Sequence, residues 1–365
     1  MLRKSVVLSI VLMLAGAGMS SAQQVAGKGQ IAFMYFYPET KTYSLMVIDL
    51  DNSAGQFYPV ALASDLASTA RPNWSLNGRS ITFTEQVDGK DDVFSVESNG
   101  QNLRNLTNDP ATDTDPVLSP NGKQIAFTSD RGKEAGQLEI YVMDADGSNV
   151  TRITRSGSDG SATLPTWQPN GQTLTYFYRP TKDAKPEVHT VNADGLGEKP
   201  LLPAQNYLGP VVWAPDGKRL AVVHSVDNRF ELVVDNADGT MLPPLMLGST
   251  PLPESSEPQF VLTPYHFAWS PDSQKIAFEY NADGNYEIYV IDLNTLKIIN
   301  ATGDGSGDRM PTWSPDGRSI AFITNRNLQY ELYTMNPDGS NLTRLSMTGR
   351  DEINPLWTLP APLDF

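Results

Sequence analysis

Residues 311–317 read Pro-Thr-Trp-Ser-Pro-Asp-Gly, and variations of this heptapeptide return along the whole chain. Its full-length relatives begin at Pro72, Pro116, Pro165, Val211 and Phe267. A shortened copy, Pro-Leu-Trp, ends at Trp357, and neighbouring copies lie 44 to 56 residues apart. Such a period is typical of repeat proteins, in which each unit stacks on the next to bury apolar surface. The sequence therefore predicts seven repeats.

Each repeat is expected to form four short strands. The Trp-Ser pair ends the first strand, and Pro-Asp-Gly or Pro-Asn-Gly predicts a tight hairpin because Asn, Asp and Gly tolerate positive φ. A second strand follows, as in 320–324, then a third, as in 287–292, and a short fourth, as in 103–107. Four antiparallel strands per repeat predict an all-β, seven-bladed β-propeller.

The two ends of the chain are expected to share one blade. Residues 29–66 supply a second, third and fourth strand without a preceding Trp strand, and residues 351–359 supply a Trp strand with nothing after it. Pairing these segments would close the ring, and the propeller would form a single domain over residues 23–365. A Pro-rich stretch at 243–264, between blades five and six, is interpreted as a surface loop.

The N-terminus has the features of a secretory signal peptide. Arg3 and Lys4 precede an apolar run over 6–17, which is shorter than the about 20 residues that span a bilayer. Small residues then lead to Ala22, so we expect cleavage after residue 22 and a periplasmic or secreted protein. The chain has no cysteine, which excludes disulfides, thiolate metal sites and a cysteine nucleophile.

The charge balance narrows the class of partner. Lys and Arg number 27 and Asp and Glu number 42, a net charge of −15. A general nucleic-acid binder needs a basic surface to displace counterions, and an anionic lipid surface attracts basic segments. We therefore expect neither a nucleic-acid partner nor membrane insertion.

The Trp-Ser-Pro-Asp-Gly, Ile-Ala-Phe, Ile-Tyr-Val-Met-Asp and Asp-Gly-Ser-Asn series resembles the TolB-like, or WD40-like PD40, β-propeller repeats. The resemblance covers nearly all of residues 29–357. It implies a propeller of the bacterial cell envelope. TolB itself carries an α/β domain ahead of a six-bladed propeller, whereas this sequence predicts seven blades and no counterpart of that domain.

Motifs for catalysis are scarce. The sequence contains no Gly-x-Ser-x-Gly, no P-loop and no dinucleotide-binding fingerprint, and it has three histidines. His189 and His224 align with Tyr or Phe of other repeats, which favours packing roles. His266 lies three residues before Trp269, at a position whose chemistry varies from repeat to repeat.

Variable positions near the starts of the innermost strands are candidate partner-binding residues, because in a propeller these positions converge on one face around the central channel. We predict that a protein or peptide binds there, on the following set: Arg71, Asp115, Asp159, His266, Asp308 and Asp351.

Several carboxylates near the starts of the innermost strands are candidate metal ligands. Asp113, Asp308 and Asp351 could supply the oxygen ligands that Ca²⁺ prefers. The alternative interpretation is that each Asp caps its own turn through a side-chain hydrogen bond. No cofactor is required by the sequence, with Ca²⁺ as the one candidate.

Two functions are compatible with these features. The first is a non-catalytic, monomeric propeller of the bacterial envelope or exterior that binds a protein or peptide. The alternative is a metal-dependent extracellular enzyme acting on polysaccharide, because the repeat also resembles oligogalacturonate lyase, whose metal is held largely by histidines. A stoichiometric transition metal in the purified protein would favour the enzyme.

Overall fold

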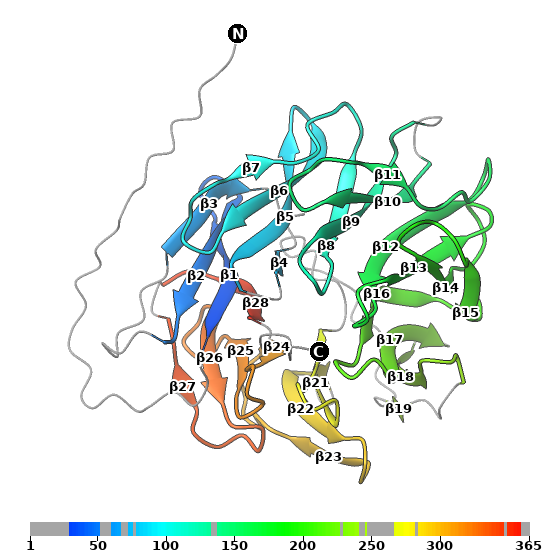
Figure 1. Cartoon of the computed structure of the whole chain (residues 1–365). Helices are drawn as coiled ribbons and strands as arrows, with labels where there is room; N and C mark the ends of the chain where they lie inside the picture. The colour runs from blue at the N-terminus through cyan, green and yellow to red at the C-terminus, as the bar shows by residue number, and fades with distance from the viewer. Residues whose placement is uncertain are drawn as a thin grey trace.

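The computed structural model describes residues 29–51, 60–66, 72–75, 78–132, 137–226, 229–240, 245–246, 266–281, 284–346 and 349–358. Within them, seven four-stranded antiparallel sheets are arranged as blades in a ring (Figure 1). The prediction of an all-β, seven-bladed propeller is confirmed. The predicted signal peptide, Arg71 and all but two residues of the Pro-rich stretch lie outside the described residues.

The blades follow the chain in order, each from its innermost to its outermost strand. Blade 1 contains β28 (Glu352–Trp357), β1 (Gln30–Tyr37), β2 (Thr42–Asp49) and β3 (Val60–Leu66). Blade 2 contains β4 (Asn73–Trp74), β5 (Ser80–Val87), β6 (Lys90–Glu97) and β7 (Arg104–Asn105). Blade 3 contains β8 (Asp113–Leu118), β9 (Gln124–Ser129), β10 (Glu139–Asp144) and β11 (Thr151–Arg152). Blade 4 contains β12 (Ser161–Trp167), β13 (Thr173–Arg179), β14 (Glu187–Asn192) and β15 (Lys199–Leu202).

The remaining three blades have the same order. Blade 5 contains β16 (Tyr207–Trp213), β17 (Arg219–Val226), β18 (Arg229–Asn236) and β19 (Leu245–Met246). Blade 6 contains β20 (Phe267–Trp269), β21 (Lys275–Asn281), β22 (Tyr286–Asp292) and β23 (Lys297–Asn300). Blade 7 contains β24 (Asp308–Trp313), β25 (Ile320–Thr324), β26 (Glu331–Met335) and β27 (Thr343–Arg344). The fourth strand predicted over 103–107 pairs over β7 alone.

The two ends of the chain close the ring as the repeat count predicts. Strand β28 pairs with β1, with Trp357 opposite Ile31, and Figure 1 shows the red strand beside the blue one. Trp357 is 1% exposed, and Thr358 donates its backbone N–H to the Gln30 carbonyl at 2.8 Å. Closure covers the edge of β1 that would otherwise be open.

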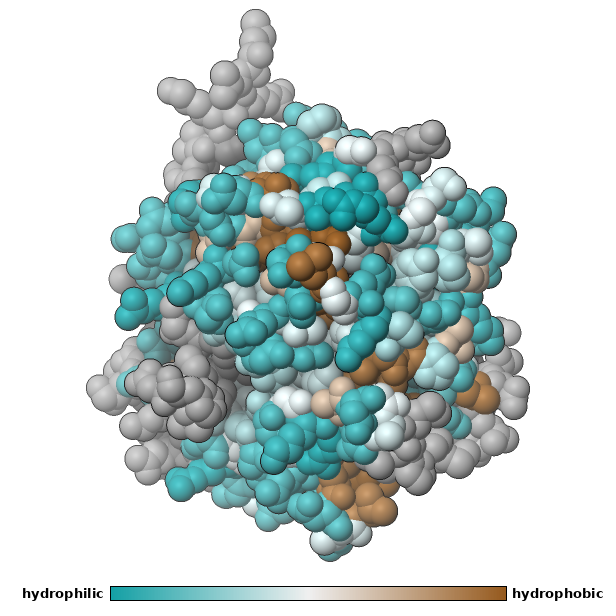
Figure 2. Space-filling view, turned by 45° about the vertical axis from the view of Figure 1, so that its right-hand side comes forward, coloured by the Kyte–Doolittle hydropathy of each residue, from teal (hydrophilic) through white to brown (hydrophobic). Residues whose placement is uncertain are grey.

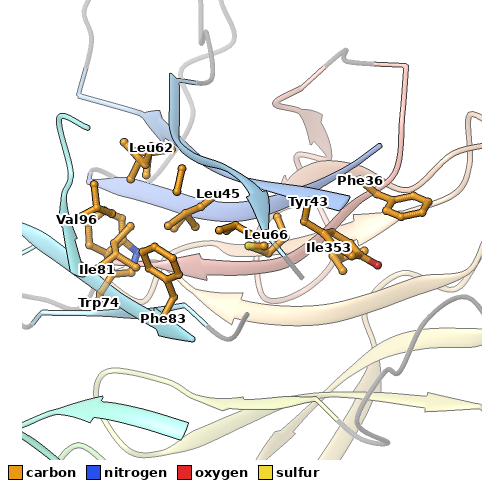
Figure 3. Packing of buried hydrophobic residues seen from close by; sticks show 14 of the residues in the cluster. Phe36, Tyr43, Leu45, Leu62, Leu66, Trp74, Ile81, Phe83, Val96 and Ile353 are labelled. Atoms are coloured by element: carbon orange, nitrogen blue, oxygen red, sulfur yellow. The ribbon is translucent and has the colours of Figure 1, made fainter. Parts of the chain in front are cut away.

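Blades are joined to their neighbours through the repeated tryptophans. The indole N–H of Trp74 donates to the Leu356 carbonyl of blade 1 at 2.9 Å. Trp167, Trp269 and Trp313 make the same bond to the innermost strand of the preceding blade. Figure 3 shows the apolar contact between two blades, where Leu45, Leu62 and Leu66 of blade 1 face Trp74, Ile81, Phe83 and Val96 of blade 2. The core is thus a series of clusters between adjacent blades.

In four blades, an acid near the start of the third strand ties the two outer strands together. Asp92 accepts a hydrogen bond from Asn105 at 2.6 Å, and Glu139 accepts one from Arg152 at 2.6 Å. Glu287 pairs with Asn300, and Glu331 with Arg344, in the same way. In blades 2, 3, 6 and 7 the acid thus gives the short outermost strand a side-chain bond in addition to its backbone pairing.

The outer surface is mainly polar. On the side that Figure 2 shows, hydrophilic residues cover most of the surface and hydrophobic ones form separate patches. Among the described residues, no helix is long and apolar enough to cross a membrane.

Removing the closing strand should destabilise the whole ring. We expect deletion of residues 351–365 to lower the midpoint of the entire unfolding transition, because it removes the buried Trp357 and exposes an edge of blade 1. Thermal unfolding followed by circular dichroism measures this. A chain ending at Thr358 is the matched control and should keep the midpoint of the full chain. An unchanged midpoint for the longer deletion would contradict closure by the C-terminal strand.

A second prediction concerns the joint between blades 6 and 7. Gly339 has φ +87°, and the hairpin that carries it lies against the outermost part of blade 6, so an added Cβ would overlap the Ala301 carbonyl. Gly89, with φ +84°, has no atom within 4 Å of the same position. Both Gly→Ala variants incur left-handed strain of about 1–2 kcal/mol, and Gly339→Ala should lose clearly more stability in denaturant titration. Equal losses would refute the close approach.

Candidate functional site

The innermost strands share a distortion at one end of the channel. The pairing register of five of them with the second strand shifts at the same place, just before the Pro-x-Trp segment. The residue at this place has a left-handed backbone in the following blades: Asp115, Leu164, Met310 and Asn354. The proline that follows each of them lacks the N–H that an unbroken ladder needs. We call the end of the ring where the innermost strands begin the channel-mouth face, and the opposite end the hairpin face.

On the channel-mouth face, an ion pair is buried between blades 6 and 7. The Glu279 side chain on β21 is fully buried, and one of its oxygens accepts a hydrogen bond from Arg309 Nη2 at 2.9 Å. Its other oxygen accepts the Met310 backbone N–H at 3.0 Å. His266 Nδ1 lies 3.6 Å from the same carboxylate. Burial disfavours ionisation of Glu279, but Arg309 and His266 outweigh it and lower the pKa from 4.5 to about 2.

Two tyrosines complete the group. The Arg309 guanidinium lies over the Tyr286 ring at 4.2 Å from its centroid, a cation–π contact. Burial raises the pKa of Tyr330, and Arg309 opposes that rise. The nearby carboxylates of Glu279, Asp351 and Asp308 add to it. We call His266, Glu279, Tyr286, Arg309 and Tyr330 the mouth cluster.

Three of the six predicted partner-binding residues lie in or beside the mouth cluster. His266 belongs to it, and Asp308 and Asp351 act on Tyr330 from β24 and from the start of β28. Asp351 also accepts the Tyr330 backbone N–H at 2.9 Å. Asp115 and Asp159 are on blade 3 and before blade 4, away from this group, and Asp159 is exposed. Arg71 lies outside the described residues.

Sequence reasoning missed Glu279 and Arg309, although a signal was present. In the repeat alignment Glu279 occupies a position at which the other blades have no ionisable residue: Met34, Thr84, Thr128, Phe177, Val223 and Ile323. Arg309 likewise replaces Thr, Gly or Ile, as at Thr114, Thr163, Gly209 and Ile353. A charged residue that appears once in an otherwise uncharged column was the usable signal.

The candidate calcium ligands are held by arginines in separate blades. Asp113 is fully buried and contacts Arg131 at 2.6 Å. Asp308 is its counterpart in blade 7 and contacts Arg326 at 3.2 Å. Burial raises the pKa of both carboxyls, and the arginines oppose the rise. The structure does not bring Asp113 to Asp308 and Asp351, so calcium binding by the three together stays a prediction without geometric support.

Each histidine is paired with a glutamate within its own blade. His189 Nε2 is 2.9 Å from Glu187, and His224 Nε2 is 2.8 Å from Glu231. His189 packs against Tyr178 with ring centroids 4.5 Å apart, which agrees with the packing role expected from its alignment with aromatics. Across the part of the chain that the structure describes, no three His, Asp or Glu residues converge closely enough to hold a metal ion.

The mouth cluster combines a neutralised ion pair with a partly exposed imidazole. Its carboxylate and guanidinium are neutralised by each other, while 25% of the His266 side chain is exposed. The cluster thus presents a polar side chain at the channel mouth beside a buried charged pair.

The buried pair should dominate the acid sensitivity of this region. We expect Glu279→Gln to lower the free energy of unfolding at pH 7 by about 3 kcal/mol, since the pKa falls by more than two units on folding. Because the folded-state pKa of Glu279 is below 4.5, its contribution is complete above about pH 4.5 and is lost as the pH falls toward 2.

Urea titrations of wild type and variant across this pH window measure the difference. Glu39→Gln is the matched control, because Glu39 pairs with Arg350 beside Tyr37 in an exposed copy of the same arrangement. Exposed pairs contribute little, so this variant should stay close to wild type. A wild-type-to-Glu279→Gln difference that did not shrink in acid would contradict the lowered pKa.

Comparison with known proteins places the fold in a family. A family model described as the TolB beta propeller domain matches residues 255–361, and one described as the Tricorn protease N-terminal beta propeller domain matches residues 90–232. A TolB homologue of Chlorobium chlorochromatii is 26% identical over 163 residues, and the match spans 45% of this chain and 35% of that protein.

Solved structures agree on the fold. A puromycin-hydrolysing peptidase of Mycobacterium tuberculosis is 14% identical with a TM-score of 0.64, over 88% of this chain and 52% of that chain. An oligogalacturonate lyase in complex with manganese is 13% identical with a TM-score of 0.55, over 88% of this chain and 99% of that chain. Identities this low show the fold alone. The repeated Trp-Ser-Pro-Asp-Gly motifs, the ring they build and the matching family model together show a β-propeller whose repeats are similar to those of the TolB beta propeller domain.

Proposed function

We propose that this protein is a non-catalytic propeller of the bacterial cell envelope or exterior that binds a protein or peptide at its channel-mouth face. The TolB-like family supports the envelope location, as does the signal peptide predicted over residues 1–22. The observation that carries the binding proposal is the mouth cluster, whose buried Glu279–Arg309 ion pair has no charged counterpart at the aligned sequence positions of the other blades.

The fold does not need this cluster. Six blades have uncharged residues at the position of Glu279. A buried ion pair is often no more stabilising than apolar residues of the same volume. Stability of the joint between blades 6 and 7 therefore gives no reason to place Glu279 and Arg309 there. Recognition gives one, because a specific partner requires anchors that are not repeated around the ring.

The two faces also differ in how far their residues can vary from blade to blade. The hairpins must keep turn residues, and Asp146, Asp238 and Asp338 each accept a hydrogen bond from the backbone two residues later. On the channel-mouth face, the loops between second and third strands differ in length and composition from blade to blade. Variable loops on a rigid scaffold favour binding.

The ends of the described chain lie on the hairpin face. Gly29 and Thr358 are next to each other and beside Pro315, which belongs to a hairpin between a first and a second strand.

The alternative of a metal-dependent polysaccharide enzyme receives less support. The likeness to the manganese-bound lyase is one of fold. The three histidines lie in blades 4, 5 and 6, and each is paired with its own glutamate. Metal analysis of the purified protein separates the two proposals, since a stoichiometric transition metal would favour the enzyme.

Charge reversal on each face tests the binding proposal. Asp159 and Asp304 are exposed or half-exposed acids of the channel-mouth face, and Asp146 and Asp338 are exposed acids of the hairpin face. We expect Asp159→Lys with Asp304→Lys to reduce the envelope protein retained by the immobilised chain, because association with a basic partner depends on complementary charge.

The control is the pair Asp146→Lys and Asp338→Lys, which adds the same charge to the hairpin face and should leave retention unchanged. Retention is quantified by mass spectrometry of proteins eluted from envelope extracts, at low and at physiological salt. Loss of binding in the hairpin-face pair alone would show that the faces are assigned the wrong way round.

A further inference from the structure

One loop of the channel-mouth face exposes a leucine in an unfavourable backbone conformation. Leu328 lies between β25 and β26, is 96% exposed and has φ +78°. A left-handed backbone brings the Cβ of a branched residue too close to the following carbonyl, and an exposed leucine gains nothing from burial. The left-handed backbone raises the free energy of the folded protein at Leu328, and the exposed side chain does nothing to offset it.

The rest of the loop is firmly held. Asn325 donates its backbone N–H to the Gly307 carbonyl at 3.1 Å and accepts the Gly307 N–H on its side chain at 2.7 Å. Asn327 donates to Glu331 at 2.9 Å and to the Tyr333 hydroxyl at 2.7 Å. Tyr330 N–H is bound by Asp351. Leu328 is therefore presented from a fixed turn, which limits the entropy lost when a partner covers it.

Other blades solve the same turn differently. Left-handed residues between the second and third strands are Lys41, Asp88, Gly89, Gly132 and Gly284 in blades 1, 2, 3 and 6. These are glycines or charged residues that suit an exposed turn. Among the residues that the structure describes, Leu328 of blade 7 is the one apolar left-handed residue between a second and a third strand. The repeat does not explain Leu328.

A second exposed, left-handed leucine has a different origin. Leu296 is 64% exposed with φ +56°, and it lies in the turn between third and fourth strands on the hairpin face. Asn102, Asn149 and Asn341 take the same conformation at the corresponding turns of blades 2, 3 and 7. Leu296 thus occupies a backbone conformation that the repeat itself imposes, and it serves as a control for Leu328.

The surroundings of Leu328 indicate the chemistry of a partner. The loop adjoins the mouth cluster through Tyr330 and carries Arg326, which contacts Asp304 at 3.0 Å and Asp308. The Asp304 side chain is 40% exposed whereas that of Arg326 is 17% exposed, so the acid is the more accessible charge of this pair. An acidic border disfavours an anionic lipid surface. A protein with an apolar pocket edged by Lys or Arg fits both features.

We propose that Leu328 is the apolar anchor of the channel-mouth face, inserted into an apolar pocket with a basic edge on a folded protein partner. The proposal rests on the proposed function and adds the residue and the pocket chemistry. Interfaces typically have a few anchors that dominate the binding energy, surrounded by polar contacts. Here the anchor is Leu328 and the polar border is Asp304 and Asp351.

The first arm of the test needs no partner. Asn adopts the left-handed conformation readily, so Leu328→Asn and Leu296→Asn should each raise the Tm by roughly 1–2 °C. A fall in Tm for Leu328→Asn would show that the leucine stabilises the free protein, and would overturn the anchor.

The second arm uses the envelope protein fraction as the probe. A photo-crosslinking amino acid at position 328 should capture a protein that the same group at position 296 does not. Leu328→Asn should weaken retention of that protein by roughly tenfold or more, and Leu296→Asn should leave it unchanged.

The outcomes separate the two proposals. If Leu328→Asn retains the partner as wild type does while Asp159→Lys with Asp304→Lys loses it, the channel-mouth face binds without this anchor and the inference is wrong. If the hairpin-face variants alone lose the partner, both the proposed function and the anchor are wrong. Equal loss in Leu328→Asn and Leu296→Asn would also refute the anchor, because it would trace to a property the two leucines share.

Discussion

The ring depends on one bond that recurs between blades, the indole N–H of the innermost-strand tryptophan donated to the backbone of the preceding blade. Trp74, Trp167, Trp269 and Trp313 reach a carbonyl there, and Trp213 reaches the Thr175 hydroxyl at 2.9 Å. The same side chains fill the apolar space between adjacent sheets. Each tryptophan thus both packs against the preceding blade and hydrogen-bonds to it, and the bond from Trp74 to Leu356 joins blade 2 to the C-terminal strand.

Function on such a scaffold is expected where the repeat is broken. Hairpins, third-strand acids and channel-mouth bulges recur in most blades, so those features serve the fold. Glu279, Arg309 and Leu328 share nothing with the corresponding residues of other blades. They lie on blades 6 and 7 and on one face, and two of them are unfavourable for stability in isolation, a buried charge and an exposed, strained leucine.

Two aligned carboxylates, Asp113 and Asp308, lie far apart in the ring although the sequence suggested one shared site. Sequence placed Asp113 and Asp308 correctly at the starts of innermost strands, and their repetition made a shared ligand site plausible. The structure shows equivalent residues in distant blades, each facing its own arginine, Arg131 or Arg326. Equivalence within a repeat implies separation around the axis, so residues that align in sequence cannot meet. His266 and Glu279, which do not align, are the ones brought together.

Sequence by itself determined the number of blades, their four strands and the pairing of β28 with β1, because period, turn residues and alternation are local properties repeated seven times. It also singled out His266, Asp308 and Asp351. Only the tertiary structure decided that Asp308 and Asp351 lie near Tyr330 and His266 near Glu279, that Glu279 and Arg309 form a buried pair, and that Leu328 is almost fully exposed. These features depend on contacts between neighbouring blades and on the course of one loop. Neither recurs with the repeat, so no periodic sequence pattern indicates them.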